Sequence, residues 1–163
     1  MKKQNSLYWD GYFMGLAKIS ALRSKDPSTK VGACIINSKK RIISLGYNGM
    51  PKGNDDEFPW AREGSQTETK YAYVIHAEMN AILNSQVNFE NCTIYTSLYP
   101  CSNCAKTIAQ SGITEVVYED DKYHNTEDAQ IARTILETSG IKTRKIDIDT
   151  KVSIEVGNQK FNI

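Results

Sequence analysis

The order of apolar and polar positions along the chain predicts helices and strands in turn. Residues 7–23 carry apolar side chains at roughly helical spacing, and Asp26-Pro27 ends that pattern. Two apolar runs at 31–36 and 42–45, joined by a polar segment, predict a β-hairpin. The remaining segments alternate in type, with helices expected at 76–85, 101–110 and 128–138, strands at 93–96 and 115–118, and a last strand between the second helix stop and residue 148.

The sequence between residues 93 and 148 also predicts how its strands are connected. Ser-Gly-Ile triplets at 111–113 and 139–141 are typical helix ends, because glycine readily takes the left-handed conformation. A strand–helix–strand–helix–strand order implies right-handed crossovers and parallel strands. We therefore expect an α/β fold, a three-layer sheet that begins with a hairpin.

Nothing in the sequence divides the chain into parts. It has no repeat, low-complexity tract or linker, so residues 1–163 are expected to form a single domain. A polar stretch follows the second strand and gives a long loop or arm at about 46–72. A connection of that length is usually functional or disordered.

Composition excludes some classes of protein. Lys and Arg number 20 against 19 Asp and Glu, and a net charge of +1 argues against nucleic acid as the main partner. No apolar run is long enough to cross a membrane, and Met1–Asp10 lacks the apolar core of a secretory signal. We expect a cytoplasmic protein, whose four cysteines then favour metal binding or catalysis over disulfides.

Two short motifs carry the candidate chemistry: His76-Ala77-Glu78 and Pro100-Cys101-Ser102-Asn103-Cys104. A Cys-x-x-Cys pair at a helix start places both sulfurs on one face, where the helix dipole favours thiolates. His76 and Glu78 can both reach a site that lies off the start of a second helix. The sequence thus predicts a zinc ion held by His76, Cys101 and Cys104, with a position left for water and Glu78 placed to move protons.

Other uses of these residues remain open at this stage. Cys-x-x-Cys alone also occurs as a redox pair, although that would leave His-Ala-Glu unexplained. A structural zinc site would need a fourth ligand, which Cys34, Cys92 or His124 could supply. The combination of H-x-E with P-C-x-x-C is the known signature of zinc deaminases.

Further motifs extend the similarity from about Tyr8 to Ile148. They are RSKDPSTKVGACI (23–35), GYNGMPKG (46–53), FPWAR (58–62), HAEMNAI (76–82), LYPCSNCAKTIAQSGI (98–113) and DKYH (121–124). On these motifs the chain resembles the deoxycytidylate (dCMP) deaminase family of the cytidine-deaminase-like superfamily. The resemblance implies an α/β/α fold around a five-stranded mixed sheet, and hydrolysis of dCMP at C4 to dUMP and ammonia, with Glu78 carrying protons.

The resemblance also implies binding residues and regulation. Family members are commonly hexamers, activated by dCTP with Mg²⁺ and inhibited by dTTP. The residues expected to contact substrate are Asn48, Ala77, Arg23 and Tyr123. The residues expected to bind the effector are Gly49, Lys52, Gly53 and Asp55.

Two competing functions use the same motifs. A tRNA adenosine deaminase shares the metal motif, but the acidic clusters at 55–57 and 119–121 interrupt any basic face for RNA. A non-catalytic zinc module that binds a partner would not need Glu78. Residues 149–163 carry no motif that bears on the choice.

Overall fold

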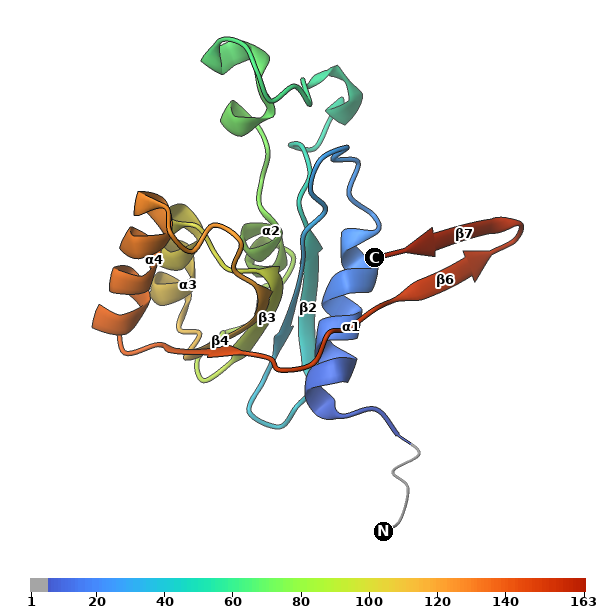
Figure 1. Cartoon of the computed structure of the whole chain (residues 1–163). Helices are drawn as coiled ribbons and strands as arrows, with labels where there is room; N and C mark the ends of the chain where they lie inside the picture. Colours follow the sequence, from blue (N-terminus) through green and yellow to red (C-terminus); the bar gives the residue numbers. More distant parts are fainter. Residues whose placement is uncertain (1–5) are drawn as a thin grey trace.

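The computed structural model describes residues 6–163; Met1–Asn5, half of the segment examined for a secretory signal, lie outside the described residues. A five-stranded sheet with the order β2-β1-β3-β4-β5 forms its centre (Figure 1). β1 pairs antiparallel with β2 and β3, whereas β3, β4 and β5 are parallel. The predicted mixed sheet is confirmed. The strands are β1 (Gly32–Ile36), β2 (Ile42–Tyr47), β3 (Thr93–Leu98), β4 (Glu115–Asp120) and β5 (Lys142–Lys145).

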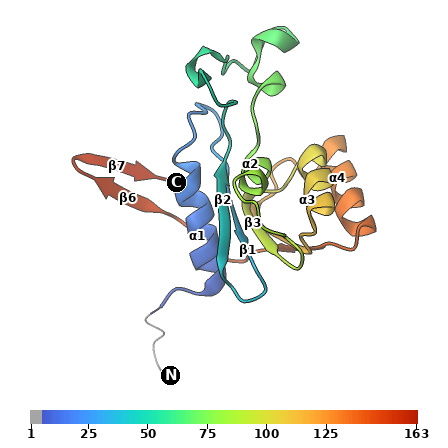
Figure 2. The same ribbon diagram turned by 180° about the vertical axis from the view of Figure 1, so that it is seen from behind.

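Helices cover both faces of the sheet and complete the three predicted layers (Figures 1 and 2). The face opposite α1 is covered by α2 (Ala77–Leu83), α3 (Ser102–Ser111) and α4 (Glu127–Thr138). α1 (Trp9–Ala21) packs alone on the other face. Because side chains alternate along a strand, β1 supplies Ala33 and Ile35 to one core and Cys34 and Ile36 to the other.

Glycines end the two helices as predicted. Gly112 follows α3 with φ of 94°, and Gly140 lies just beyond α4 with φ of 72°. Both values are in the left-handed region that L-residues with a Cβ disfavour. The strands that follow each turn then enter the sheet in parallel with β3.

The polar stretch after β2 is a folded arm. Gly49 and Ile75 donate N–H groups to each other's carbonyls at 3.0 and 2.8 Å and close its neck. Beyond the neck the chain forms three short 3₁₀ helices, η1 (Asp55–Glu57), η2 (Gln66–Glu68) and η3 (Lys70–Ala72). The arm extends past one end of the sheet (Figure 1).

The C-terminal segment forms an unpredicted hairpin of β6 (Ser153–Val156) and β7 (Gln159–Asn162). It projects from the body beside α1 (Figures 1 and 2). Among the described residues, no helix is both long and apolar enough to span a bilayer.

A polar cluster ties α1 to the sheet. Asp10 accepts hydrogen bonds from the Tyr95 hydroxyl at 2.6 Å and from the Arg144 guanidinium at 2.6 and 3.0 Å. The bond from Arg144 is the main reason that the pKa of Asp10 lies below its ordinary value. One carboxylate thereby connects α1, β3 and β5.

Candidate metal centre and substrate cavity

Three metal-ligating side chains meet where two helices begin. His76 immediately precedes α2, Cys101 immediately precedes α3, and Cys104 lies in the first turn of α3. His76 Nδ1 lies 3.4 Å from the Sγ atom of each cysteine. Within residues 6–163 these three form the group of side chains able to hold an ion, with ligand atoms no more than 4.8 Å apart. The predicted convergence of two helix N-termini is confirmed.

The chemistry of this donor set fits zinc. Two sulfurs and one imidazole form a borderline-soft set that zinc prefers. The hydrogen bond from Cys104 lowers the pKa of Cys101 to about 4, so that this sulfur is a thiolate at neutral pH. Hydrogen bonding to Cys101 in turn raises the pKa of His76 to about 9. The sulfur and the neighbouring carboxylates thus favour a positive charge on the imidazole, which would give up its proton when it ligates an ion.

The candidates for a fourth protein ligand lie elsewhere. Cys34 is fully buried in the core beneath α1, where burial raises its pKa to about 12. Cys92 is buried in the opposite core. The His124 Nδ1 atom lies 3.2 Å from an Arg133 guanidinium nitrogen. In the described part of the chain, none of them joins the metal-ligating group, which favours an open site over a closed structural one.

Glu78 lies beside the metal-ligating group without belonging to it. Its side chain is buried in the first turn of α2. Its carboxylate accepts a hydrogen bond from the Thr96 hydroxyl at 3.4 Å, and Oε2 lies 3.6 Å from the Cys104 sulfur. Burial raises the pKa of Glu78. A buried carboxyl group with a raised pKa can both accept and return a proton.

Close packing of α2 on β2 sets the position of His76 and Glu78. The Ser44 hydroxyl donates to the Ala81 carbonyl at 2.6 Å, and the Asn80 amide donates to the Tyr47 carbonyl at 2.8 Å. Between these bonds, Gly46 brings the strand backbone directly against the helix backbone. The start of α2 is therefore held by the strand beneath it.

A cavity of about 440 Å³ opens beside this group. His76, Glu78 and Cys101 line it, together with Asn48, which directly follows β2. The volume is within the range of small-ligand sites. The catalytic candidates therefore face a space large enough for a nucleotide-sized molecule.

The expected substrate residues divide between two places. Asn48, Ala77 and Tyr123 line the cavity. Arg23 lies outside it, with its guanidinium carbon 5.9 Å from the centroid of the Tyr47 ring. The α1 helix ends at Ala21, and the chain beyond it turns Arg23 to the other side of the strand end.

Arg23 belongs to a second depression of about 210 Å³. Three of the four expected effector residues, Gly49, Lys52 and Asp55, also line this depression. Gly53 is absent from its lining and has φ of 123° in the adjacent turn. The predicted effector residues are therefore gathered near one another, apart from the metal centre.

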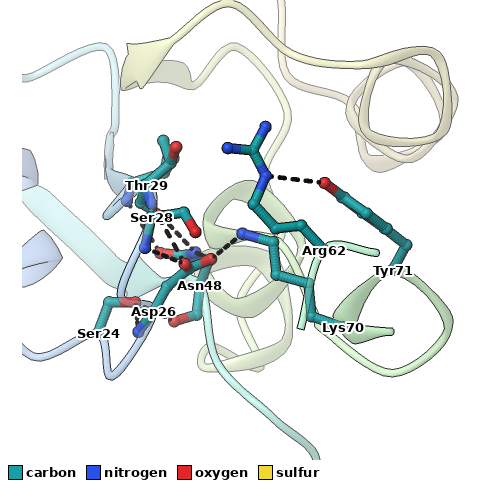
Figure 3. A network of polar contacts seen from close by, with 9 residues as sticks. Ser24, Asp26, Ser28, Thr29, Asn48, Arg62, Lys70 and Tyr71 are labelled. Carbon is teal, nitrogen blue, oxygen red and sulfur yellow. Dashed lines mark hydrogen bonds and ion pairs between the residues drawn. The ribbon is translucent and has the colours of Figure 1, made fainter. Parts of the chain in front are cut away.

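Several polar residues of the cavity had no predicted role, and four of them form a connected network with Asn48. They are Asp26, Arg62, Lys70 and Tyr71. Three of them, Arg62, Lys70 and Tyr71, come from the arm and are drawn with Asp26 in Figure 3. Arg62 could have been predicted as a cavity residue, because it is the basic residue of the FPWAR motif. Burial of Lys70 had no local signal, because lysine is rarely buried.

Known proteins resemble this chain in sequence and in fold. Residues 7–120 match the family model "Cytidine and deoxycytidylate deaminase zinc-binding region". The deoxycytidylate deaminase of Homo sapiens is 48% identical over 147 residues, which cover 88% of this chain and 83% of that protein. The probable deoxycytidylate deaminase of Drosophila melanogaster is 45% identical over 166 residues, covering 91% and 82%.

Among solved structures, the dCMP deaminase of cyanophage S-TIM5 in its apo form superposes with a TM-score of 0.65. It is 24% identical, and the match covers 84% of this chain and 96% of that one. The same phage enzyme has been solved in complex with dCMP and dUMP. The structural likeness supports the α/β/α fold with a five-stranded mixed sheet.

Proposed function

This chain belongs to the cytidine and deoxycytidylate deaminase family, and from that membership we propose that it is a zinc-dependent enzyme that hydrolyses dCMP to dUMP and ammonia. The observation that carries the proposal is the open three-ligand group of His76, Cys101 and Cys104 beside the unligated carboxyl group of Glu78. We also propose that residues 1–163 form one deaminase domain, whose arm borders the substrate cavity.

The reaction replaces the C4–N4 bond of cytosine by a C4–O bond. His76, Cys101 and Cys104 would hold the zinc ion, which would lower the pKa of a water molecule and supply a nucleophile at neutral pH. Glu78 accepts a proton from the attacking water and delivers it to ring N3. It then takes the proton of the new C4 hydroxyl and gives it to the amino group, so that the C4–N4 bond breaks, ammonia leaves and the C4 carbonyl forms. Burial of Glu78 excludes bulk water from these transfers.

The cavity suggests how the rest of the nucleotide is bound. With the base against Ala77 and Glu78, the sugar lies toward Asn48 and the phosphate lies toward the arm. Arg62, at the mouth, provides guanidinium donors that suit a phosphate monoester, and Tyr123 provides a hydroxyl. We assign the phosphate contact to Arg62 in place of Arg23, because Arg23 faces the other depression.

We further propose that the second depression binds the effectors. It contains Arg23, Lys25 and Lys52, whose charges suit a triphosphate, and Asp55, which suits an accompanying Mg²⁺ ion. Lys25 is already paired with Asp55 at 2.9 Å, so an effector would have to rearrange this contact. Gly49 lines the depression, and its neighbour Asn48 lines the cavity. A change in the backbone at Gly49 when dCTP or dTTP binds would therefore alter the position of Asn48 in the substrate site. Assembly into a homohexamer is part of the same proposal.

Substitution of Glu78 by Gln tests the catalytic proposal. Gln has nearly the same shape and can still accept from Thr96, so zinc content and fold should be retained. We expect kcat for ammonia release from dCMP to fall by roughly 10²–10⁴-fold, because general acid–base catalysis is lost. E137Q, an exposed change on α4, is the matched control.

Three outcomes of these measurements oppose the proposals. Unchanged turnover in E78Q would reject the role of Glu78. Wild-type activity on a tRNA anticodon stem but not on dCMP would reject the substrate. Kinetics that stay constant across a dCTP–Mg²⁺ titration would reject the effector proposal alone. A molar mass below that of six chains in light scattering would reject the hexamer.

A further inference from the structure

One buried ion pair connects the arm to the body of the molecule. Lys70 Nζ lies 2.6 Å from Asp26 Oδ2, and the two side chains are 8% and 2% exposed (Figure 3). Between residues 51 and 75, Thr69 and Lys70 are the buried residues, and the rest of the arm is exposed or half-buried. Lys70 is thus the charged side chain by which the arm enters the interior.

Asp26 has no acceptor capacity left for a substrate. Its Oδ1 atom accepts the backbone N–H groups of Ser28 and Thr29 at 2.8 and 3.2 Å. Its Oδ2 atom accepts from Lys70 and from the Asn48 side-chain amide at 3.2 Å. These four bonds fill the four lone-pair positions of a carboxylate. Asp26 therefore contributes to the site by holding other groups in position.

One of the groups held by Asp26 is Asn48. Its amide nitrogen donates to Asp26 and to the Thr29 carbonyl at 3.0 Å, while its Oδ1 atom accepts the Val31 N–H at 2.9 Å. These partners fix the orientation of the amide. Oδ1 has a second lone pair, for which the described residues provide no hydrogen-bond donor, and Asn48 lines the cavity. None of these bonds involves Lys70.

The other end of the network lies at the cavity mouth. Tyr71 follows Lys70 directly, and its hydroxyl accepts a hydrogen bond from Arg62 Nε at 3.3 Å. Figure 3 shows Lys70 directed to Asp26 and Tyr71 directed to Arg62, with the terminal guanidinium nitrogens pointing away from both contacts. Within residues 6–163 those terminal nitrogens have no hydrogen-bond partner. They remain available to an anion.

We propose that the Lys70–Asp26 ion pair is a latch that fixes the arm so that Arg62 stands ready for the phosphate of a nucleoside monophosphate. Lys70 and Asp26 are then positioning residues that act through Arg62, while Asp26 separately orients Asn48. The inference rests on the proposed function, because it needs a phosphate-bearing substrate. Without the latch, the arm keeps its neck at Gly49–Ile75 but loses its buried attachment. Arg62 then samples many positions, and the conformational entropy lost when it is ordered weakens the binding of the nucleotide.

The K70M variant tests the latch through steady-state kinetics. We expect KM for dCMP to rise about 10–100-fold with kcat within about threefold of wild type, because the chemistry at Glu78 is untouched. K70R, which keeps a charged donor, should recover part of the loss. K106M, which removes an exposed charge on α3, is the matched control. If K70M does not fold, K70Q replaces it, since its amide can still donate to Asp26.

A double-mutant cycle separates a latch from simple destabilisation. If Lys70 acts through Arg62, KM of K70M/R62A should equal that of R62A alone. Trypsin should also cleave after Arg62 faster in K70M than in wild type. Multiplying effects of the two substitutions, or a loss confined to kcat, would overturn the latch. Absence of wild-type activity on dCMP would instead reject the proposed function, so the two failures are distinguishable.

Discussion

Substitution of Gly46 by Ala tests whether the contact between β2 and α2 sets the geometry of the metal centre. A Cβ atom on Gly46 would lie 2.4 Å from the Ala77 carbonyl oxygen and 2.4 Å from the Ala81 nitrogen. Both atoms belong to the backbone of α2, so no side chain can rotate to make room. The helix and the strand would have to separate by about 1 Å to reach van der Waals distance.

The expected cost follows from that displacement. His76 and Glu78 lie at the start of α2, whereas Cys101 and Cys104 lie at the start of α3, which does not pack on Gly46. A misplacement of about 1 Å near the reacting groups lowers kcat on the order of 10²-fold. Overpacking should also reduce the free energy of unfolding by about 1–3 kcal/mol. Ammonia release at saturating zinc and dCMP, together with urea unfolding, measures both quantities.

The G15A variant is the control for this prediction. A Cβ on Gly15 meets no atom within 4 Å, and the residue lies in α1 on the opposite face of the sheet. Alanine should therefore stabilise the helix by about 0.5–1 kcal/mol and leave kcat unchanged. If G46A kept wild-type kcat and stability, the strand beneath α2 would not control the position of the site.

Three further predictions concern zinc, the core and acid stability. Removal of zinc by a chelator should abolish ammonia release, and added zinc should restore it, with metal content followed by elemental analysis. L136A, at a fully buried position in α4, should lower the free energy of urea unfolding by about 3–5 kcal/mol and leave KM unchanged. The bond from Arg144 lowers the pKa of Asp10 from 3.8, so its stabilisation is present above that pH and lost as pH falls through the folded-state pKa. D10N should therefore be less stable than wild type by about 1 kcal/mol at pH 7, because this ion pair is partly exposed. The difference in the free energy of unfolding should shrink as the pH falls below 3.8, which urea unfolding curves at several pH values between 7 and 3 measure.

The sequence predicted the metal ligands because their geometry is local. Cys101 and Cys104 lie three residues apart at a helix start, which by itself places the sulfurs side by side. The same reasoning placed His76 before a second helix. The mixed sheet followed from the order of the elements and the handedness of their connections.

Contacts between distant segments were beyond this reasoning. The partners Asp26 and Lys70 are 44 residues apart, and nothing near Lys70 indicates burial. Arg23 was assigned to the substrate from its motif, but the direction of its side chain depends on the turn after α1 and on Tyr47. The β6–β7 hairpin did carry a signal, since Gly157-Asn158 separates two short alternating runs.

The location of the arm has a consequence for how such an enzyme can change. The three metal ligands and Glu78 all belong to helix starts built on the central sheet, whereas Arg62, Lys70 and Tyr71 belong to one excursion between residues 49 and 75. The metal-ligating residues and the arm residues that line the cavity therefore lie in separate stretches of chain. A shorter or different excursion, closed by the same backbone bridge, would change the wall of the cavity at Arg62 and Tyr71 and leave the metal-ligating residues and Glu78 in place.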